Sequence, residues 1–117
     1  MLKTITEYEW AIENDVIMLR QVEKVGEGAV FSRTMFIRSD GTIEKITETI
    51  GRITKTRREE FLPSDFEKIR KVLSYFLEHG DDKEKVWFLN QVLLYSPMQY
   101  IYSLLKRYQE KRKLPSL

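Results

Sequence analysis

The sequence predicts an α+β fold in which an antiparallel β-meander of three to four strands precedes three α-helices packed on one face. β-branched residues dominate the first half, an Asp-Gly pair there marks a hairpin turn, and apolar residues recur at helical spacing after Pro63. At 117 residues the chain has the size of one domain with one core. We therefore expect a single domain over 1–117, mainly β over 1–62, helical over 63–113 and frayed over 114–117.

The best-defined element of the first half is a hairpin centred on Asp40-Gly41. This pair tolerates the positive φ angles of a two-residue type I′ turn. Counting outward from the turn predicts that Ile37 lies opposite Glu44. Each residue before Ile37 then lies opposite the next residue after Glu44, so that Met35 faces Ile46. The face expected to be buried carries Phe31, Met35, Ile37, Ile46 and Ile50. The opposite, mostly polar face carries Ser32, Thr34, Phe36, Arg38, Ile43, Lys45, Thr47 and Thr49.

The segments that flank this hairpin allow more than one interpretation. Residues 15–25 fit a further strand, whereas residues 4–13 fit a helix and a strand equally well. Isoleucines within 42–56 recur at helical spacing, but nine of these fifteen residues are Thr or Ile, which favours strands. Gly51 then marks a bulge, bend or turn, followed by a strand or a basic edge over 52–58.

The first predicted helix follows the Leu62-Pro63 break. Ser64 and Glu67 have the spacing of a capping box, so the helix is expected to begin at Ser64. Gly80 is a suitable residue just past the helix end. The apolar stripe of this helix comprises Phe66, Ile69, Val72, Leu73, Phe76 and Leu77.

Two further helices are predicted after Gly80. Asp81 and Asp82 provide a cap and favourable charge for a helix that continues to Tyr95. Ser96 and Pro97 fit the start of a third helix, because proline is favoured in a first turn. Its apolar stripe comprises Met98, Ile101, Leu104, Leu105 and Tyr108.

Composition excludes several classes of functional site. The chain has no cysteine, which rules out disulfides, thiolate zinc sites and cysteine nucleophiles. Its one histidine, His79, rules out multi-histidine metal sites. Gly26-Glu27-Gly28 lacks the lysine and hydroxyl of a P-loop. We therefore expect no catalytic residue, no metal site and no cofactor, and we interpret the protein as a non-enzyme.

Hydropathy indicates a soluble protein. The N-terminal residues lack the apolar core of a signal peptide, and no stretch has the uninterrupted apolar length of a membrane span. Charged residues make up 32% of the chain, and Asn and Gln together number only six, a composition seen in thermophile proteins. We expect a cytoplasmic location without membrane contact, and the composition leans towards a hot-environment source.

The leading functional hypothesis is a small binding or accessory protein that acts through protein–protein contacts. Adjacent helical residues point about 100° apart, so Trp87 and Phe88 cannot both face a narrow core. Aromatic side chains are typical anchors of protein interfaces, whereas a wide helix buried on two sides would explain the same pair without a partner. The interface candidates, for a protein partner or a second copy, are Trp87, Leu94, Tyr95 and Tyr102.

The alternative hypothesis is a small DNA- or RNA-binding protein, because two basic segments stand out in a chain of net charge +2. The sheet candidates are Phe36, Arg38, Lys45, Arg52, Lys55, Arg57 and Arg58, and the C-terminal candidates are Lys106, Arg107, Lys111, Arg112 and Lys113. A solvated edge strand explains the first group without a ligand. Cations that complement a helix dipole explain the second group.

Overall fold

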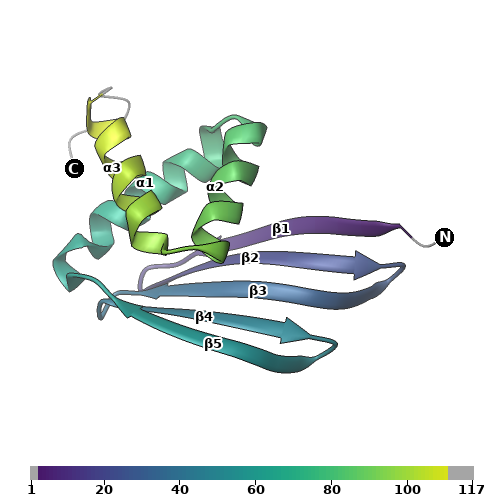
Figure 1. Ribbon diagram of the computed structural model, residues 1–117. Helices are drawn as coiled ribbons and strands as arrows, with labels where there is room; N and C mark the ends of the chain where they lie inside the picture. The colour runs from purple at the N-terminus through teal and green to yellow at the C-terminus, as the bar shows by residue number, and fades with distance from the viewer. Residues whose placement is uncertain (1–2, 111–117) are drawn as a thin grey trace.

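The computed structural model describes residues 3–110 and contains one five-stranded antiparallel sheet followed by three helices (Figure 1). The strands are β1 Thr4–Ile12, β2 Val16–Val25, β3 Gly28–Arg38, β4 Thr42–Thr49 and β5 Arg52–Glu60, and they lie in the sheet in chain order. A 3₁₀ turn, η1 Pro63–Asp65, precedes α1 Phe66–His79, α2 Asp82–Leu94 and α3 Pro97–Glu110. The predicted α+β meander is confirmed, with five strands in place of three to four. The expected tail at 114–117 lies outside the described residues.

The two ambiguous segments of the first half are both strands. Alternation puts Tyr8, Trp10 and Ile12 of β1 on the helix side of the sheet. Tyr8 and Ile12 pack against the core, while Trp10 stays 41% exposed. β5 follows a two-residue turn in which Ile50 and Gly51 have φ angles of 49° and 74°. Positive φ at both positions is the type I′ geometry that matches the twist of a hairpin.

The register predicted for the β3–β4 hairpin is wrong by one residue. Ile37 pairs with Ile43, where the sequence predicted Glu44. The loop has three residues instead of two: Gly41 N–H donates to the Arg38 carbonyl at 3.0 Å, and Gly41 has a φ of 92°. This is a type I turn followed by a left-handed residue, the usual three-residue hairpin loop. The Asp40 carboxylate fixes it by accepting from Thr42 N at 3.0 Å and from Thr42 Oγ1 at 2.7 Å.

This slip moves every β4 side chain to the other face of the sheet. Ile43, placed by the prediction on the polar face, is fully buried under the helices. Ile46 lies on the opposite face, and Ile50 is 77% exposed in the β4–β5 turn. Lys45 turns towards the helices. For β3 the predicted buried face is correct at Met35 and Ile37, which are fully buried, but Phe31 is only half-buried and Ser32 on the other face is buried.

The start of α1 also differs from the prediction. Ser64 lies inside the 3₁₀ turn, and α1 begins at Phe66 without a side-chain cap. The Glu67 carboxylate instead accepts hydrogen bonds from Arg70 Nε at 3.2 Å and Nη2 at 2.8 Å, so the capping box does not form. At the other end, Gly80 is extended rather than left-handed, with φ −70° and ψ 159°.

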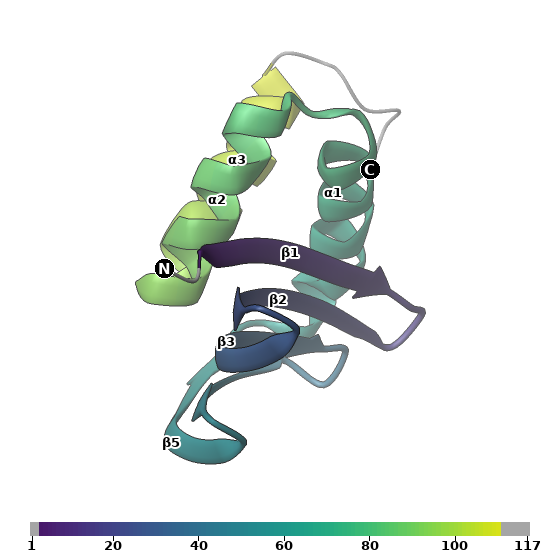
Figure 2. The same ribbon diagram turned by 90° about the vertical axis from the view of Figure 1, so that its right-hand side faces the viewer.

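The predicted cap of α2 is confirmed, because the Asp81 carboxylate accepts from the backbone N–H groups of Lys83 and Glu84. All three helices cover the same face of the sheet, and the end with the β2–β3 and β4–β5 turns extends beyond them (Figures 1 and 2). α2 lies against β2 and β3. The core between the layers includes Ile17, Leu19, Met35, Ile37, Ile43, Ile69, Phe76, Phe88, Leu89 and Ile101.

Candidate functional sites

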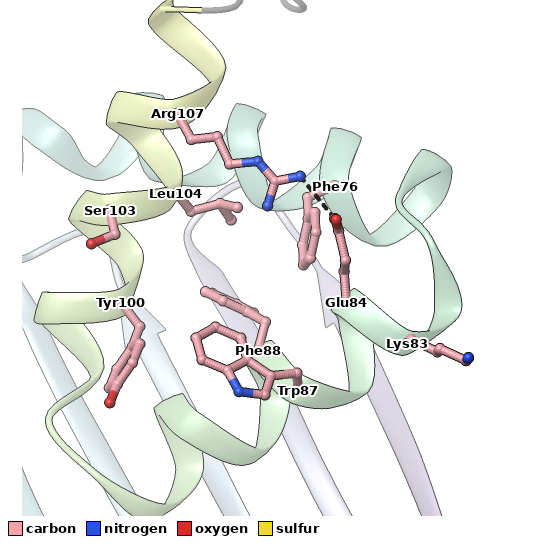
Figure 3. A pocket seen from close by; sticks show the side chains of 9 residues that line it. All are labelled: Phe76, Lys83, Glu84, Trp87, Phe88, Tyr100, Ser103, Leu104 and Arg107. Carbon is pink, nitrogen blue, oxygen red and sulfur yellow. Dashed lines mark hydrogen bonds and ion pairs between the residues drawn. The ribbon is translucent and has the colours of Figure 1, made fainter.

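A groove of about 380 Å³ lies between α2 and α3. We name it the α2–α3 groove and define it by the nine residues that line it, which Figure 3 shows: Phe76, Lys83, Glu84, Trp87, Phe88, Tyr100, Ser103, Leu104 and Arg107. Trp87 is 57% exposed, whereas the next residue, Phe88, is 3% exposed. The two adjacent aromatics therefore divide as their helical spacing predicts, one into the core and one to the surface.

Trp87 is held in place by a second aromatic side chain. Its ring meets Tyr100 of α3 edge to face, with centroids 5.9 Å apart. At the far end of the groove Arg107 Nη2 donates to Glu84 Oε2 at 2.8 Å, which ties α3 to α2 (Figure 3). Lys83 points away from the ion pair and the rings. The groove thus has an aromatic side, an apolar floor and one neutralised ion pair.

The other three interface candidates lie elsewhere. Leu94, 42% exposed, lines a different pocket, and Tyr95, 55% exposed, follows the C-terminal end of α2. Tyr102 is 41% exposed, and its hydroxyl donates to Asp65 Oδ2 at 2.6 Å, which joins α3 to η1. The structure therefore does not unite the four candidates on one surface.

The Tyr102–Asp65 hydrogen bond predicts a loss of stability at alkaline pH. The bond to the Asp65 carboxylate, followed by partial burial and the negative charge, raises the pKa of Tyr102 from 10.0 to about 12. Because the pKa is higher in the folded state, the stabilisation is complete below pH 10 and disappears as the pH rises from about 10 to about 12. Burial also raises the pKa of Tyr108, so we expect tyrosinate absorbance to show late-titrating groups, one of which Tyr102→Phe removes. If Tyr102→Phe removes only a group that titrates near pH 10, the bond is contradicted.

A second concave site, of about 420 Å³, lies where the C-terminal end of α2 overhangs β3, β4 and β5. We name it the cationic pocket; it is lined by Phe31, Arg33, Lys45, Thr47, Thr54, Lys55, Arg57, Leu93 and Leu94. Register explains the gathering of charge, because directly opposite residues of paired strands share a face. Arg33 pairs with Thr47 and Thr47 with Lys55, while Lys45 pairs with Arg57 in the next row.

Arg33 is fixed by a part-buried polar network that joins α2 to the sheet. Its Nη1 donates to Gln21 Oε1 at 2.9 Å, and Gln21 Nε2 donates to Asn90 Oδ1 at 3.0 Å. The Tyr8 hydroxyl donates to the same Asn90 oxygen at 2.8 Å. The Arg33 guanidinium also lies over the Phe31 ring, 4.4 Å from its centroid. No sequence pattern predicted this role for Arg33, because the network joins four elements that only the fold brings together.

Lys45 is fixed by the C-terminal end of α2. Its ammonium donates to the Tyr95 carbonyl at 2.5 Å and to the Val92 carbonyl at 3.3 Å, which satisfies carbonyls that a helix end leaves without partners. Burial lowers the pKa of Lys45, and the nearby positive charges of Arg57, Lys55 and Arg33 lower it further, against an opposing effect of Glu59.

The structure divides the nucleic-acid candidates among separate surfaces. Lys45, Lys55 and Arg57 share the cationic pocket, and Arg52 faces the same side of the sheet because it pairs with Thr49. Three candidates lie on the opposite face as a result of the register: Phe36, Arg38 and Arg58. Arg38 is already engaged there, 3.3 Å from Glu44. On α3, Lys106 is exposed and Arg107 is paired with Glu84, while Lys111, Arg112 and Lys113 lie outside the described residues.

Within residues 3–110, no group of three or more His, Asp or Glu side chains gathers closely enough to hold a metal ion. In the same part of the chain no helix combines the length and the apolar character needed to cross a membrane. Comparisons of the chain with protein-family models, with curated proteins and with solved structures find no match.

Proposed function

We propose that this protein is a non-catalytic binding protein that docks a protein partner in the α2–α3 groove. The observation that carries the proposal is a large, 57% exposed indole at the mouth of an apolar hollow, held in position by Tyr100. A Trp ring that loses its remaining contact with water on association is the typical centre of an interface hot spot. The fixed ring has little conformational freedom left to lose on binding.

The occupant that best fits the groove is a short amphipathic helix of the partner with one bulky apolar anchor and acidic neighbours. A hollow of about 380 Å³ is at the lower end of ordinary ligand clefts, which suits one or two inserted side chains better than a whole element. Arg107 is paired with Glu84, so the net positive charge of the lining comes from Lys83, which points away from the rings at the rim of the groove. Acidic residues beside the anchor complement it.

Trp87→Ala is expected to weaken such an interaction by about 2 kcal/mol or more, which is roughly 30-fold in Kd. The test uses helical peptides selected against the wild-type protein from a library that fixes one aromatic or Leu anchor between acidic residues. Affinities of the selected peptides are then measured by fluorescence polarisation. Tyr95→Ala is the matched control, because Tyr95 is equally exposed at the end of the same helix and does not line the groove.

Selected peptides that bind Trp87→Ala as tightly as the wild type would refute the proposal. Sedimentation velocity over a range of protein concentrations checks for a second copy as the occupant. A dimer that Trp87→Ala dissociates and Tyr95→Ala leaves intact would replace the peptide partner by self-association.

A further inference from the structure

The cationic pocket has a charge balance that the folded chain itself does not neutralise. Four of its nine lining residues are cations and none is acidic. Among residues 3–110, Arg33, Lys45, Lys55 and Arg57 all lack a carboxylate within ion-pair distance. Other exposed cations of the sheet do have such partners, as Lys24 has Glu7 at 2.9 Å. Glu59, whose charge raises the pKa of Lys45, does not line the pocket. The pocket is therefore distinguished by four cations that lie together with no acid in its lining.

Two of the four cations are held in fixed positions before any ligand arrives. Gln21 and the Phe31 ring hold Arg33, and two α2 carbonyls hold Lys45. The Arg33 hydrogen bond uses one terminal nitrogen, which leaves other guanidinium N–H groups for a ligand oxygen. Preorganised donors lower the entropic cost of binding an anion.

The remaining wall of the pocket indicates what the anion is attached to. Leu93, Leu94 and Phe31 provide apolar surface directly beside the cations, and Thr47 provides a hydroxyl, while the Thr54 hydroxyl donates to the Thr47 carbonyl at 3.3 Å. An isolated inorganic anion would leave this apolar wall exposed. A ligand that carries both phosphate oxygens and a flat, weakly polar ring satisfies both parts.

We propose that the cationic pocket binds the phosphate groups of a nucleotide ligand, either as a unit of a single-stranded nucleic acid or as a free nucleotide. Arg33 and Arg57 supply forked N–H donors that suit phosphate, and Lys45 and Lys55 supply point charges. Residues two apart on a strand lie about 7 Å apart, so Lys55 and Arg57 can reach successive phosphates. The uncovered end of the sheet, which carries Arg52, continues the same surface (Figure 1).

The alternative explanation is that these cations only protect β5, an edge strand, from pairing with other chains. It explains Lys55 and Arg57 but not Arg33, which is on the central strand β3 and is fixed by a network to α2. Edge protection also predicts no difference between cations on the two faces of β5. Phosphate binding predicts a large one.

The experiment compares two double variants that remove the same charge. Lys55→Gln/Arg57→Gln removes the two β5 cations that line the pocket, and Arg58→Gln/Lys68→Gln removes one cation from the opposite face of β5 and one from an exposed position on α1. The probes are fluorescein-labelled oligo(dT) and oligo(U), measured by fluorescence polarisation across a salt series, and ATP, measured by calorimetry. A poly-glutamate peptide of matched charge tests for a general polyanion effect. Circular dichroism checks that both variants remain folded.

We expect the pocket variant to lose at least ~10-fold in affinity, while the control variant stays within about twofold of the wild type. In the pocket variant, the slope of log Kd plotted against log salt concentration should also fall by roughly 1–2. Oligonucleotide binding that ATP does not compete for identifies single-stranded nucleic acid, and ATP binding alone identifies a free nucleotide. Equal losses in the two variants, equal binding of poly-glutamate, or no binding of any probe at low salt would overturn the proposal. Trp87→Ala is expected to leave this binding unchanged, because Trp87 does not line the cationic pocket.

Discussion

Phe76→Ala is expected to lower the free energy of unfolding by about 3–5 kcal/mol, the largest effect of any single substitution considered for this protein. Phe76 is 1% exposed, and its ring packs edge to face against Phe88 of α2 and Tyr108 of α3, with centroids 5.3 Å and 6.2 Å away. It therefore joins all three helices, and its truncation leaves a cavity that the fixed helix ends cannot close. Chemical denaturation followed by circular dichroism measures the effect.

Two comparisons make the Phe76 result specific to the core. Tyr95→Ala removes a ring that is 55% exposed and is expected to change stability by no more than about 0.5 kcal/mol. Because Phe76 also lines the floor of the α2–α3 groove, Phe76→Ala should enlarge this groove and weaken peptide binding in the fraction that remains folded. A loss of stability below about 1.5 kcal/mol would contradict the packing of the three helices around this ring.

Gly41→Ala is expected to have the second largest effect, a loss of about 2–4 kcal/mol. Gly41 has a φ of 92°, and a Cβ built on it would lie 2.6 Å from the Phe61 carbonyl oxygen and 2.9 Å from Pro63 Cγ. The Phe61 N–H also donates to the Gly41 carbonyl at 2.8 Å. The β3–β4 hairpin turn thus packs against the segment that connects β5 to η1, which is where the chain passes from the sheet to the helices.

Gly26→Ala is the matched control for Gly41→Ala. Gly26 has a positive φ of 62°, but a Cβ there meets nothing within 4 Å, so its substitution should cost only the ~1–2 kcal/mol of the left-handed backbone. The difference between the two variants in urea denaturation isolates the contact with Phe61 and Pro63. Equal losses in the two variants would show that the hairpin turn does not pack there.

The two proposed sites use different parts of α2. Trp87 reaches the α2–α3 groove from one side of the helix, while Leu93 and Leu94 at its C-terminal end line the cationic pocket. Asn90, between them, anchors the helix to Tyr8 and Gln21 of the sheet. Because separate variants empty each site, protein binding and phosphate binding can be tested independently.

Local signals in the sequence determined much of this structure. Pro63, the cap at Asp81 and the Pro97 start delimit the helical half, because prolines and capping carboxylates act on the backbone within a few residues. Helical spacing correctly separated Phe88 from Trp87 for the same reason. The capping box predicted at Ser64 does not form, because Ser64 lies within the 3₁₀ turn and the Glu67 carboxylate accepts from Arg70 instead.

Only the tertiary structure decided the register of the β3–β4 hairpin and, with it, the composition of the cationic pocket. Two- and three-residue loops are both common in hairpins, and either register offers the core an isoleucine, Ile46 in the predicted one and Ile43 in the observed one. The Asp40–Thr42 hydrogen bonds and the packing of Gly41 on Phe61 favour the longer loop. Lys45 consequently lies on the same face as Arg33 and points towards α2, because a slip of one residue exchanges the two faces of a strand.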